Sequence, residues 1–147
     1  MIALVQRVRF ARVKVDERVA GAIGPGLLVF VCAEPADTEE IADKLVERLL
    51  KLRVFGDEAG KMNRSVVDVQ AGLLIVSQFT LAADLSGGHR PSFSGAAPEP
   101  LARRLYERVL ATARGRHPIV QAGEFGERMQ VELSNDGPVT IPITLRR

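Results

Sequence analysis

The amino-acid sequence predicts an α+β fold: a barrel-like sheet of antiparallel and mixed strands, with two main helices packed on one side. Six or seven strand-like segments accompany only two helical ones, and the helices do not alternate regularly with the strands. The outer segments alternate apolar and polar residues, which favours antiparallel pairing. A chain of 147 residues has the commonest size of one compact domain, so we expect residues 1–147 to form a single domain.

The first element is a long strand over residues 2–15, where apolar side chains alternate with arginines. The apolar phase slips at Ala11–Arg12, which predicts a bulge or sharp bend there. Asp16-Glu17 has the composition of a turn, so residues 18–23 should return antiparallel to the first strand.

Two continuous apolar runs, Leu27–Ala33 and Leu73–Val76, are typical of strands that are covered on both faces. Between them a helix is predicted to begin with Asp37 as its cap and Glu40 three residues on, as in a capping box. Its apolar stripe consists of Ile41, Leu45, Leu49 and Leu52. A second helix is predicted from about Glu99 to Arg114, with an apolar stripe of Leu101, Leu105, Val109 and Ala113.

The C-terminal part alternates apolar and polar residues over 129–133 and again over 139–145, which predicts two strands. Asn135-Asp136-Gly137 between them is turn-forming. A long loop over residues 82–98 is rich in Gly, Ser, Pro and Ala, and ordered loops of this length are usually functional.

Composition and charge exclude several classes of protein. Apolar residues make up 46% and charged residues 26%, which argues against disorder, and the net charge of +2 is too small to indicate a partner. The apolar runs are far shorter than the ~20 residues of a membrane span, and the N-terminus lacks the pattern of a signal peptide. We therefore expect a soluble, cytoplasmic protein with no membrane contact.

The sequence offers no metal or cofactor site. Cys32 is the only cysteine and lies inside a buried run, which indicates a small core residue rather than a reactive thiol. The two histidines, His89 and His117, lack a carboxylate at a telling spacing, and the glycines fit no phosphate or dinucleotide pattern. We therefore expect no metal, no cofactor and no histidine-based catalysis.

Polar residues interrupt the second buried strand at Ser77-Gln78-Phe79-Thr80. Two interpretations are open. The strand ends here and its polar groups bond to neighbouring backbone, or it delivers backbone N–H groups and two hydroxyls to the edge of a cleft. Breaks in the local pattern are places where functional sites are expected.

A second break in the pattern lies at Ser134–Thr140, which contains Gly137-Pro138. From the local sequence alone, a trans turn between two strands is favoured, because only about 5–6% of X-Pro bonds in folded proteins are cis. The sequence has only two asparagines, Asn63 and Asn135, and both lie in turn-like segments, which is a weak indication of a functional role.

Five segments occur together in the order and spacing of one family. They are Gln6-Arg7-Val8, Gly60–Asn63, Ser77–Leu81, Arg90–Phe93 and Asn135–Thr140. The chain resembles the D-aminoacyl-tRNA deacylases from end to end. The resemblance implies a homodimer that hydrolyses the ester joining a D-amino acid, or glycine mischarged on tRNA-Ala, to the terminal adenosine of tRNA.

The resemblance also implies that the Gly137-Pro138 bond is cis and enters the site of the partner subunit. The chain departs from the family at Ser86–His89, where a lysine-rich stretch is usual, and in its tail over residues 141–147. The first departure removes the lysines with which that loop would contact the tRNA backbone. The second leaves the residues of the chiral check unchanged.

For catalysis, we expect Gln78, Phe79 and Thr80 to act at the ester. Thr80 as a covalent nucleophile would need a neighbouring base, and the motif holds none, so an orienting role is favoured over attack. The resemblance points to help from the vicinal ribose hydroxyl of the substrate. The N–H groups of Phe79 and Thr80 would then stabilise the oxyanion.

For substrate binding, we expect Ser77, Gly137, Pro138, Phe125 and Arg7 to contribute. Rigid Gly-Pro carbonyls beside the substrate Cα leave room only for hydrogen there, so that L substrates are rejected by a clash. Arg7 is either a clamp for the partner's Gly-Pro carbonyls or an exposed strand arginine. Phe125 either stacks on the terminal adenine or fills the core.

Two other classes of function stay open. A non-catalytic RNA-binding barrel would bind acceptor stems and leave esters intact. A general small-molecule esterase would cleave simple D-amino esters as fast as charged tRNA, and the absence of a histidine-based triad counts against it.

Overall fold

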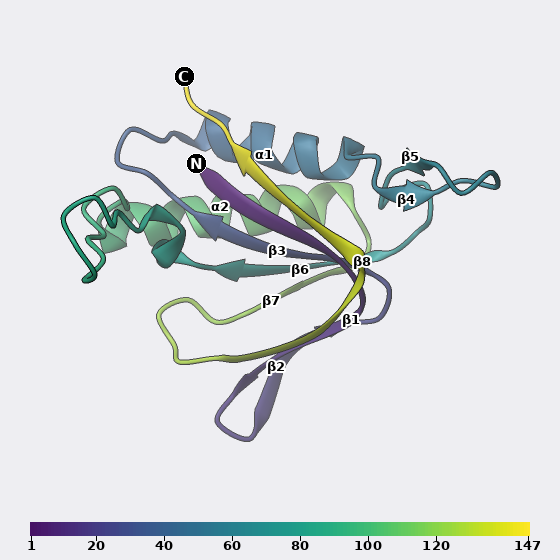
Figure 1. Ribbon diagram of the computed structural model, residues 1–147, viewed down its shortest axis with the longest axis horizontal. Helices are drawn as coiled ribbons and strands as arrows, with labels where there is room; N and C mark the ends of the chain where they lie inside the picture. Colours follow the sequence, from purple (N-terminus) through teal and green to yellow (C-terminus); the bar gives the residue numbers. More distant parts are fainter.

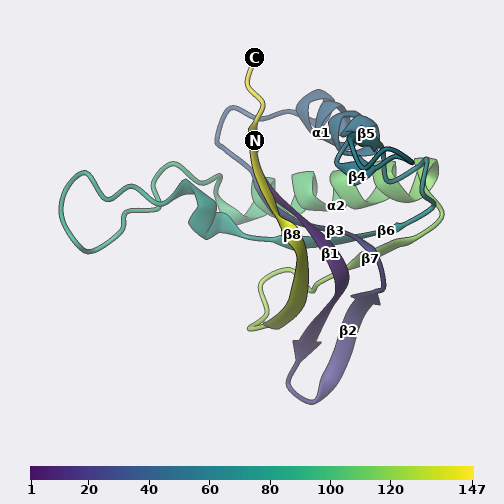
Figure 2. The ribbon, with the colours of Figure 1, turned by 45° about the vertical axis from the view of Figure 1, so that its right-hand side comes forward.

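The computed structural model describes residues 1–147 as a strongly bent, mixed sheet with two helices on one side (Figures 1 and 2). This confirms the predicted α+β class. The strands are β1 (Ile2–Val15), β2 (Arg18–Ile23), β3 (Gly26–Cys32), β4 (Phe55–Gly56), β5 (Met62–Arg64), β6 (Gly72–Ser77), β7 (Val120–Ala122) and β8 (Gln130–Thr144). The helices are α1 (Glu39–Lys51), α2 (Glu99–Arg116) and the short 3-10 helix η1 (Phe79–Ala82).

The long strand β1 organises the sheet. It is antiparallel to β2, β3 and β8, whereas β3 with β6 and β6 with β7 are parallel pairs. Gly21 on β2 comes so close to β7 that a Cβ atom there would lie 2.6 Å from the carbonyl oxygen of Ala122. The sheet is therefore nearly closed, which confirms the mixed, barrel-like arrangement that was expected.

The strands β3 and β6 are covered on both faces, as their continuous apolar runs predict. Their alternate residues enter two separate cores. The core beneath the helices includes Leu27, Val29, Leu73 and Ile75, and the core inside the barrel includes Leu28, Leu74 and Val76. Burying one such side chain fully stabilises the fold by about 1.5–3 kcal/mol. The ends of β3 and β6 are therefore firmly held, and so are the residues that directly follow them in the chain.

The bulge predicted at Ala11–Arg12 is wrong, because both residues pair in regular register with β2 and β8. Shifts of register occur instead at Val13/Lys14 against β2 and between Gln6 and Phe10 against β8. The apolar phase of β1 changes near Arg7 because β8 leaves the ladder opposite that residue.

The two strands predicted over residues 129–133 and 139–145 are one strand, β8, which is antiparallel to β1 along its whole length. The segment Asn135–Val139, here called the Gly-Pro loop, does not reverse the chain. It bulges outward between the pairs Val8–Asn135 and Gln6–Thr140. Its Gly137-Pro138 peptide bond is cis rather than trans.

The N-cap of α1 is Thr38 rather than Asp37, and its hydroxyl accepts a hydrogen bond from Ile41 N at 3.3 Å. The Asp37 carboxylate is occupied elsewhere, by the Met1 ammonium at 2.9 Å and by Glu34 N at 2.7 Å. The helix α2 extends two residues beyond its predicted end, to Arg116. Neither α1 nor α2 has the length and apolar character that a membrane-crossing helix needs.

Candidate functional site

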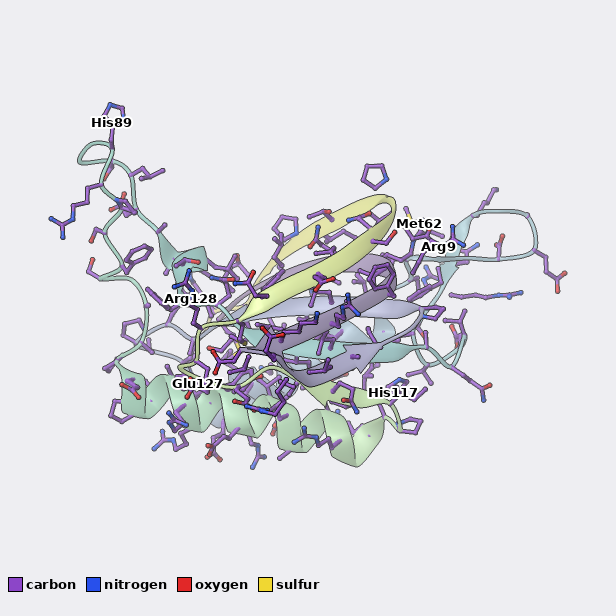
Figure 3. All side chains as sticks on the ribbon, turned by 90° about the horizontal axis from the view of Figure 1, so that it is seen from below. Arg9, Met62, His89, His117, Glu127 and Arg128 are labelled. Carbon is purple, nitrogen blue, oxygen red and sulfur yellow. The ribbon has the colours of Figure 1, made fainter.

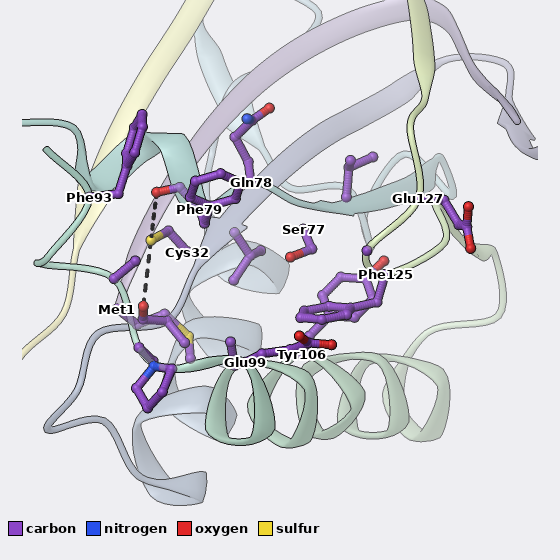
Figure 4. A pocket seen from close by; sticks show the side chains of 18 of the residues that line it. Met1, Cys32, Ser77, Gln78, Phe79, Phe93, Glu99, Tyr106, Phe125 and Glu127 are labelled. Carbon is purple, nitrogen blue, oxygen red and sulfur yellow. Dashed lines mark hydrogen bonds between the residues drawn. The ribbon is translucent and has the colours of Figure 1, made fainter. Parts of the chain in front are cut away.

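A pocket of about 680 Å³ opens where β3 and β6 end, between η1 and the first turns of α2 (Figure 4). Apolar residues form 14 of its 20 lining positions, which suits a ligand with an aromatic or apolar part. Four of the predicted site residues line it together: Ser77, Gln78, Phe79 and Phe125. These four residues come from two distant segments of the sequence, and the fold brings them together.

The turn after β6 supplies backbone donors at the pocket wall. Gln78 N donates to Val31 O at 2.8 Å, which fixes the end of β6 against β3. Phe79 and Thr80 then begin η1. The N–H groups at the start of a helix have no acceptor within the helix, so η1 itself offers none to Phe79 N or Thr80 N. This turn is compatible with both interpretations of the polar break.

Thr80 does not line the pocket, and its side chain is exposed. Its hydroxyl accepts a hydrogen bond from the side-chain nitrogen Nε2 of Gln78, and this side-chain amide does not titrate. No histidine or carboxylate bonds to Thr80 Oγ1. This geometry favours the orienting role over the nucleophilic one, in line with the argument from the sequence.

Phe79 forms the outer lip of the pocket. Its side chain is 57% exposed and packs edge-to-face against Phe93, with ring centroids 5.1 Å apart. The Cys32 thiol lies behind it, 3.5 Å from the Phe79 carbonyl oxygen. Cys32 is 2% exposed, and burial raises the pKa of its thiol, which confirms its interpretation as an inert core residue.

The two histidines lie away from the pocket. His89 is exposed at the tip of the loop that follows η1 (Figure 3). His117 is buried, and its Nε2 donates to Ala71 O at 2.6 Å. Both have the surface or hydrogen-bonded roles that the sequence indicated.

Phe125 lies on the opposite wall, where the helix α2 holds it from the side. Its ring is 5.9 Å from the Tyr106 ring, and the Arg103 guanidinium lies over it at 4.5 Å. Phe125 is half-buried and packs against the core, yet it also borders the cavity. The packing against the core agrees with the second interpretation made from the sequence, and stacking on an adenine stays a prediction.

Sequence reasoning missed three residues that build the pocket: Met1, Phe93 and Tyr106. The Tyr106 hydroxyl donates to Ile75 O at 2.8 Å and to Gly123 O at 3.2 Å, and burial raises its pKa to about 12. Its position as the only tyrosine, on the buried stripe of α2, was the available indication. Phe93 lies in a segment that already carried the family resemblance.

No local sequence pattern indicates that Met1 lines the pocket. Its ammonium group is bound by Glu34 at 2.9 Å, by Asp37 at 2.9 Å and by the carbonyl oxygen of Leu145 at 2.7 Å. The Arg146 guanidinium and this ammonium hold the pKa of Glu34 below its usual value. The two terminal segments therefore lie side by side (Figure 1), and Met1 lines the pocket.

Arg7 does not act as an exposed strand arginine. It is half-buried, and its Nε donates to Asp136 O at 2.8 Å while its Nη1 donates to Val54 O at 2.6 Å. Within this chain it therefore holds its own Gly-Pro loop. Asn135 completes the support, since its Oδ1 accepts from Val139 N at 2.8 Å and its Nδ2 donates to Thr140 Oγ1 at 3.0 Å.

The Gly-Pro loop and the pocket lie at opposite ends of β3. Arg7 pairs with Leu27 near its start, whereas Cys32 at its end contacts Phe79. Five residues at about 3.3 Å each separate the two ends by roughly 16 Å. Figure 3 shows that Glu127, which lines the pocket, lies well apart from Arg9 of β1. Gly137 and Pro138 therefore do not line the pocket of their own chain.

Known proteins share this fold and sequence. The family model described as D-Tyr-tRNA(Tyr) deacylase matches residues 4–144. A D-aminoacyl-tRNA deacylase from Methylibium petroleiphilum is 72% identical, over 99% of this chain and 95% of its own. The protein of that name from an Azoarcus species is 62% identical, over 99% and 96%.

Two solved structures superpose on the chain. The c-Myc DNA Unwinding Element Binding Protein does so with a TM-score of 0.94 and 40% identity, over 100% of both chains. A probable eukaryotic D-amino acid tRNA deacylase has a TM-score of 0.84 and 17% identity, over 97% of both chains, and so shows a likeness of fold alone.

The fold and these full-length similarities define the chain as a hydrolase of the deacylase class. More particularly, it belongs to the D-Tyr-tRNA(Tyr) deacylase family. This confirms the resemblance first drawn from its five sequence segments.

Proposed function

We propose that this chain hydrolyses the ester bond of D-aminoacyl-tRNA, and of glycyl-tRNA mischarged on tRNA-Ala, and releases the free amino acid and tRNA. The observation that carries the proposal is a relative named D-aminoacyl-tRNA deacylase that is 72% identical over 99% of the chain. We place the enzyme in the cytoplasm, with its tRNA substrate, and treat residues 1–147 as its one domain.

The pocket suits ester hydrolysis without a protein nucleophile. As water adds to the ester carbonyl, its oxygen gains negative charge, and the N–H groups of Phe79 and Thr80 are the donors for it. One such donor typically contributes about 3–4 kcal/mol of transition-state stabilisation. The vicinal hydroxyl of the ribose assists the leaving oxygen, and the Gln78–Thr80 hydrogen bond orients the turn.

The terminal adenine stacks on Phe125 in this proposal, and Ser77 faces the ribose between Phe125 and η1. Base–aromatic stacking contributes about 1–3 kcal/mol for one base. The apolar wall of the pocket supports this placement, because an aromatic base buries well against it.

Chiral selection requires the Gly-Pro loop of a second copy. The loop is exposed at Gly137 and Pro138, and roughly 16 Å of strand separates it from the pocket of its own chain. In a two-fold homodimer each subunit gives a loop and receives one. The carbonyls of the loop would then face the substrate Cα, so that a D side chain is accepted and an L side chain clashes.

A paired deacylation assay tests the proposal. D-tyrosyl-tRNA and L-tyrosyl-tRNA are incubated with the protein, and D-tyrosine ethyl ester serves as the small ester. We expect hydrolysis of D-tyrosyl-tRNA alone. Binding of tRNA with intact ester would favour the RNA-binding barrel, and equal turnover of the ethyl ester would favour a general esterase.

Light scattering at assay concentration tests the dimer separately. An active monomer would contradict the shared site and leave the deacylase activity standing.

A further inference from the structure

A cation covers one face of the Phe125 ring. The Arg103 guanidinium lies 4.5 Å from the ring centroid, and Tyr106, three residues on in the same helix, packs against the ring at 5.9 Å. Residues three apart share one face of a helix, so α2 holds Phe125 with two neighbouring side chains. Arg103 itself does not line the cavity, whereas Phe125 does.

The Arg103 guanidinium retains most of its hydrogen-bonding capacity. Its nearest carboxylate is Glu99, at 3.6 Å, and that carboxylate is 72% exposed. An arginine presents five N–H donors in a planar fork, and stacking on an aromatic ring uses none of them. Arg103 is 47% exposed, so solvent reaches its side chain, and its contact with Glu99, which lines the pocket, places it close to the opening.

The rim is where a polynucleotide would leave the pocket. Glu99 and Ala102 of α2 line one side of the opening, and Gly126 and Glu127 line the other. Arg103 lies between these two walls, since it contacts Glu99 and stacks on Phe125. The rim residues Glu99 and Glu127 are acidic and repel a phosphate, so Arg103 is the cation that this part of the opening offers to one.

We propose that Arg103 binds the phosphodiester on the 5′ side of the terminal nucleotide while it supports Phe125 from behind. This inference rests on the proposed function, because it assumes that the terminal adenine stacks on the free face of Phe125. An arginine fork that is already fixed by stacking is well suited to phosphate oxygens. The single-stranded 3′ end of tRNA is the ligand class.

The substitution Arg103→Met separates the two roles, because methionine keeps an apolar stem against Phe125 and removes the charge. The matched control is Arg104→Met, the next residue of α2, which is exposed and does not line the pocket. Two substrates are compared: D-tyrosyl-tRNA and D-tyrosyl-adenosine, which has no phosphodiester.

For Arg103→Met we expect KM for D-tyrosyl-tRNA to rise about five- to tenfold with kcat nearly unchanged. The slope of log kcat/KM against log salt should become shallower by about 0.7, the value for one phosphate contact on a single strand. Hydrolysis of D-tyrosyl-adenosine should stay at the wild-type rate. Arg103→Lys, which keeps the charge, should retain the salt slope.

Equal salt slopes in Arg103→Met and Arg104→Met would overturn the inference. So would an equal loss on both substrates, which would reduce Arg103 to a support for Phe125. A wild-type protein that leaves D-tyrosyl-tRNA intact would instead refute the proposed function. In that case the phosphate contact is tested by measuring how the binding of uncharged tRNA to Arg103→Met and to Arg104→Met depends on salt concentration.

Discussion

The two ends of the sheet hold their predicted site residues in different ways. At the pocket end, the turn after β6 rests on fully buried residues such as Ile75 and on the buried hydroxyl of Tyr106. At the other end, the Gly-Pro loop is exposed at Gly137 and Pro138; Arg7 donates a hydrogen bond to Asp136 O, and Asn135 Oδ1 accepts one from Val139 N. Packing therefore fixes the pocket, and polar contacts fix the loop. We expect changes to buried residues at the pocket end to alter stability and activity together, and changes to exposed residues there or in the loop to alter activity alone.

The largest effect is expected for Gly137→Ala. A Cβ atom there would lie 2.5 Å from Val139 N, so the loop must shift. A loop shifted from its position loses its contacts with the substrate, and we expect kcat/KM for D-tyrosyl-tRNA to fall about 10- to 100-fold, or about 1.4–2.7 kcal/mol of transition-state stabilisation. Because the loop is exposed, the melting temperature should change by no more than about 2 °C.

The control for this substitution is Gly87→Ala, at an exposed glycine around which a Cβ atom would meet nothing within 4 Å. It should leave both activity and melting temperature unchanged. Full activity of Gly137→Ala on D-tyrosyl-tRNA would refute the role of the loop in the site.

The difference between the two ends also explains what the sequence could predict. At the pocket end, the apolar runs and the polar break after them are local patterns, and they correctly indicated β3, β6 and the turn at Gln78. The position of Phe125 was accessible only through the family resemblance. Tyr106 was missed because its hydroxyl bonds to two carbonyls that are distant in the sequence.

At the loop end, long-range contacts overrode local patterns. The Asn135–Gly137 segment has turn composition, yet β1 pairs with β8 on both sides of it, so it bulges instead of reversing. Asp37 and Thr38 are both suited to cap α1, and the choice between them was made by the Met1 ammonium, which takes the aspartate. These interactions join residues that are far apart in the sequence, so no local pattern predicts them.

The next effect in size is expected for Tyr106→Phe. The change removes hydrogen bonds to Ile75 O and Gly123 O, and a buried hydrogen bond contributes about 0.5–1.5 kcal/mol. We expect the free energy of unfolding to fall by about 1 kcal/mol and kcat/KM to fall severalfold, measured by urea denaturation and deacylation. Lower activity with unchanged stability would break the comparison, because packing would then not fix the pocket.

A smaller effect is expected for Asp43→Asn. Asp43 lies between the helices α1 and α2, away from both ends of the sheet. Hydrogen bonds from Arg108 and Thr112 lower the pKa of Asp43 to about 2. A lowered pKa stabilises the fold above the unfolded value of 3.8, and this stabilisation is lost as the pH falls toward 2. Because the pair is partly exposed, screening limits the loss at pH 7 to about 0.5–1 kcal/mol.

Urea denaturation of Asp43→Asn and wild type across pH 2 to 7 checks this expectation. The difference in unfolding free energy should be constant above about pH 4 and shrink below it. Deacylation should be unaffected. The control Glu40→Gln removes only an exposed pair with Lys44, at 3.3 Å, and should show a smaller difference. A constant difference down to pH 2 would contradict the assignment of the stabilisation to the Asp43 carboxylate.

The smallest effect is expected for Thr80→Ala, at the edge of the pocket end. Thr80 is exposed and its hydroxyl bonds only to Gln78, so the substitution should leave the unfolding free energy unchanged. Loss of an orienting hydrogen bond, at about 0.5–1 kcal/mol, should lower kcat about two- to fivefold and leave hydrolysis measurable. The control Thr144→Ala removes an exposed threonine at the end of β8 and should have no effect. Mass spectrometry of the quenched wild-type reaction provides the decisive measurement: an acyl group on Thr80 would make it a nucleophile, and the backbone N–H groups would no longer suffice as the account of catalysis.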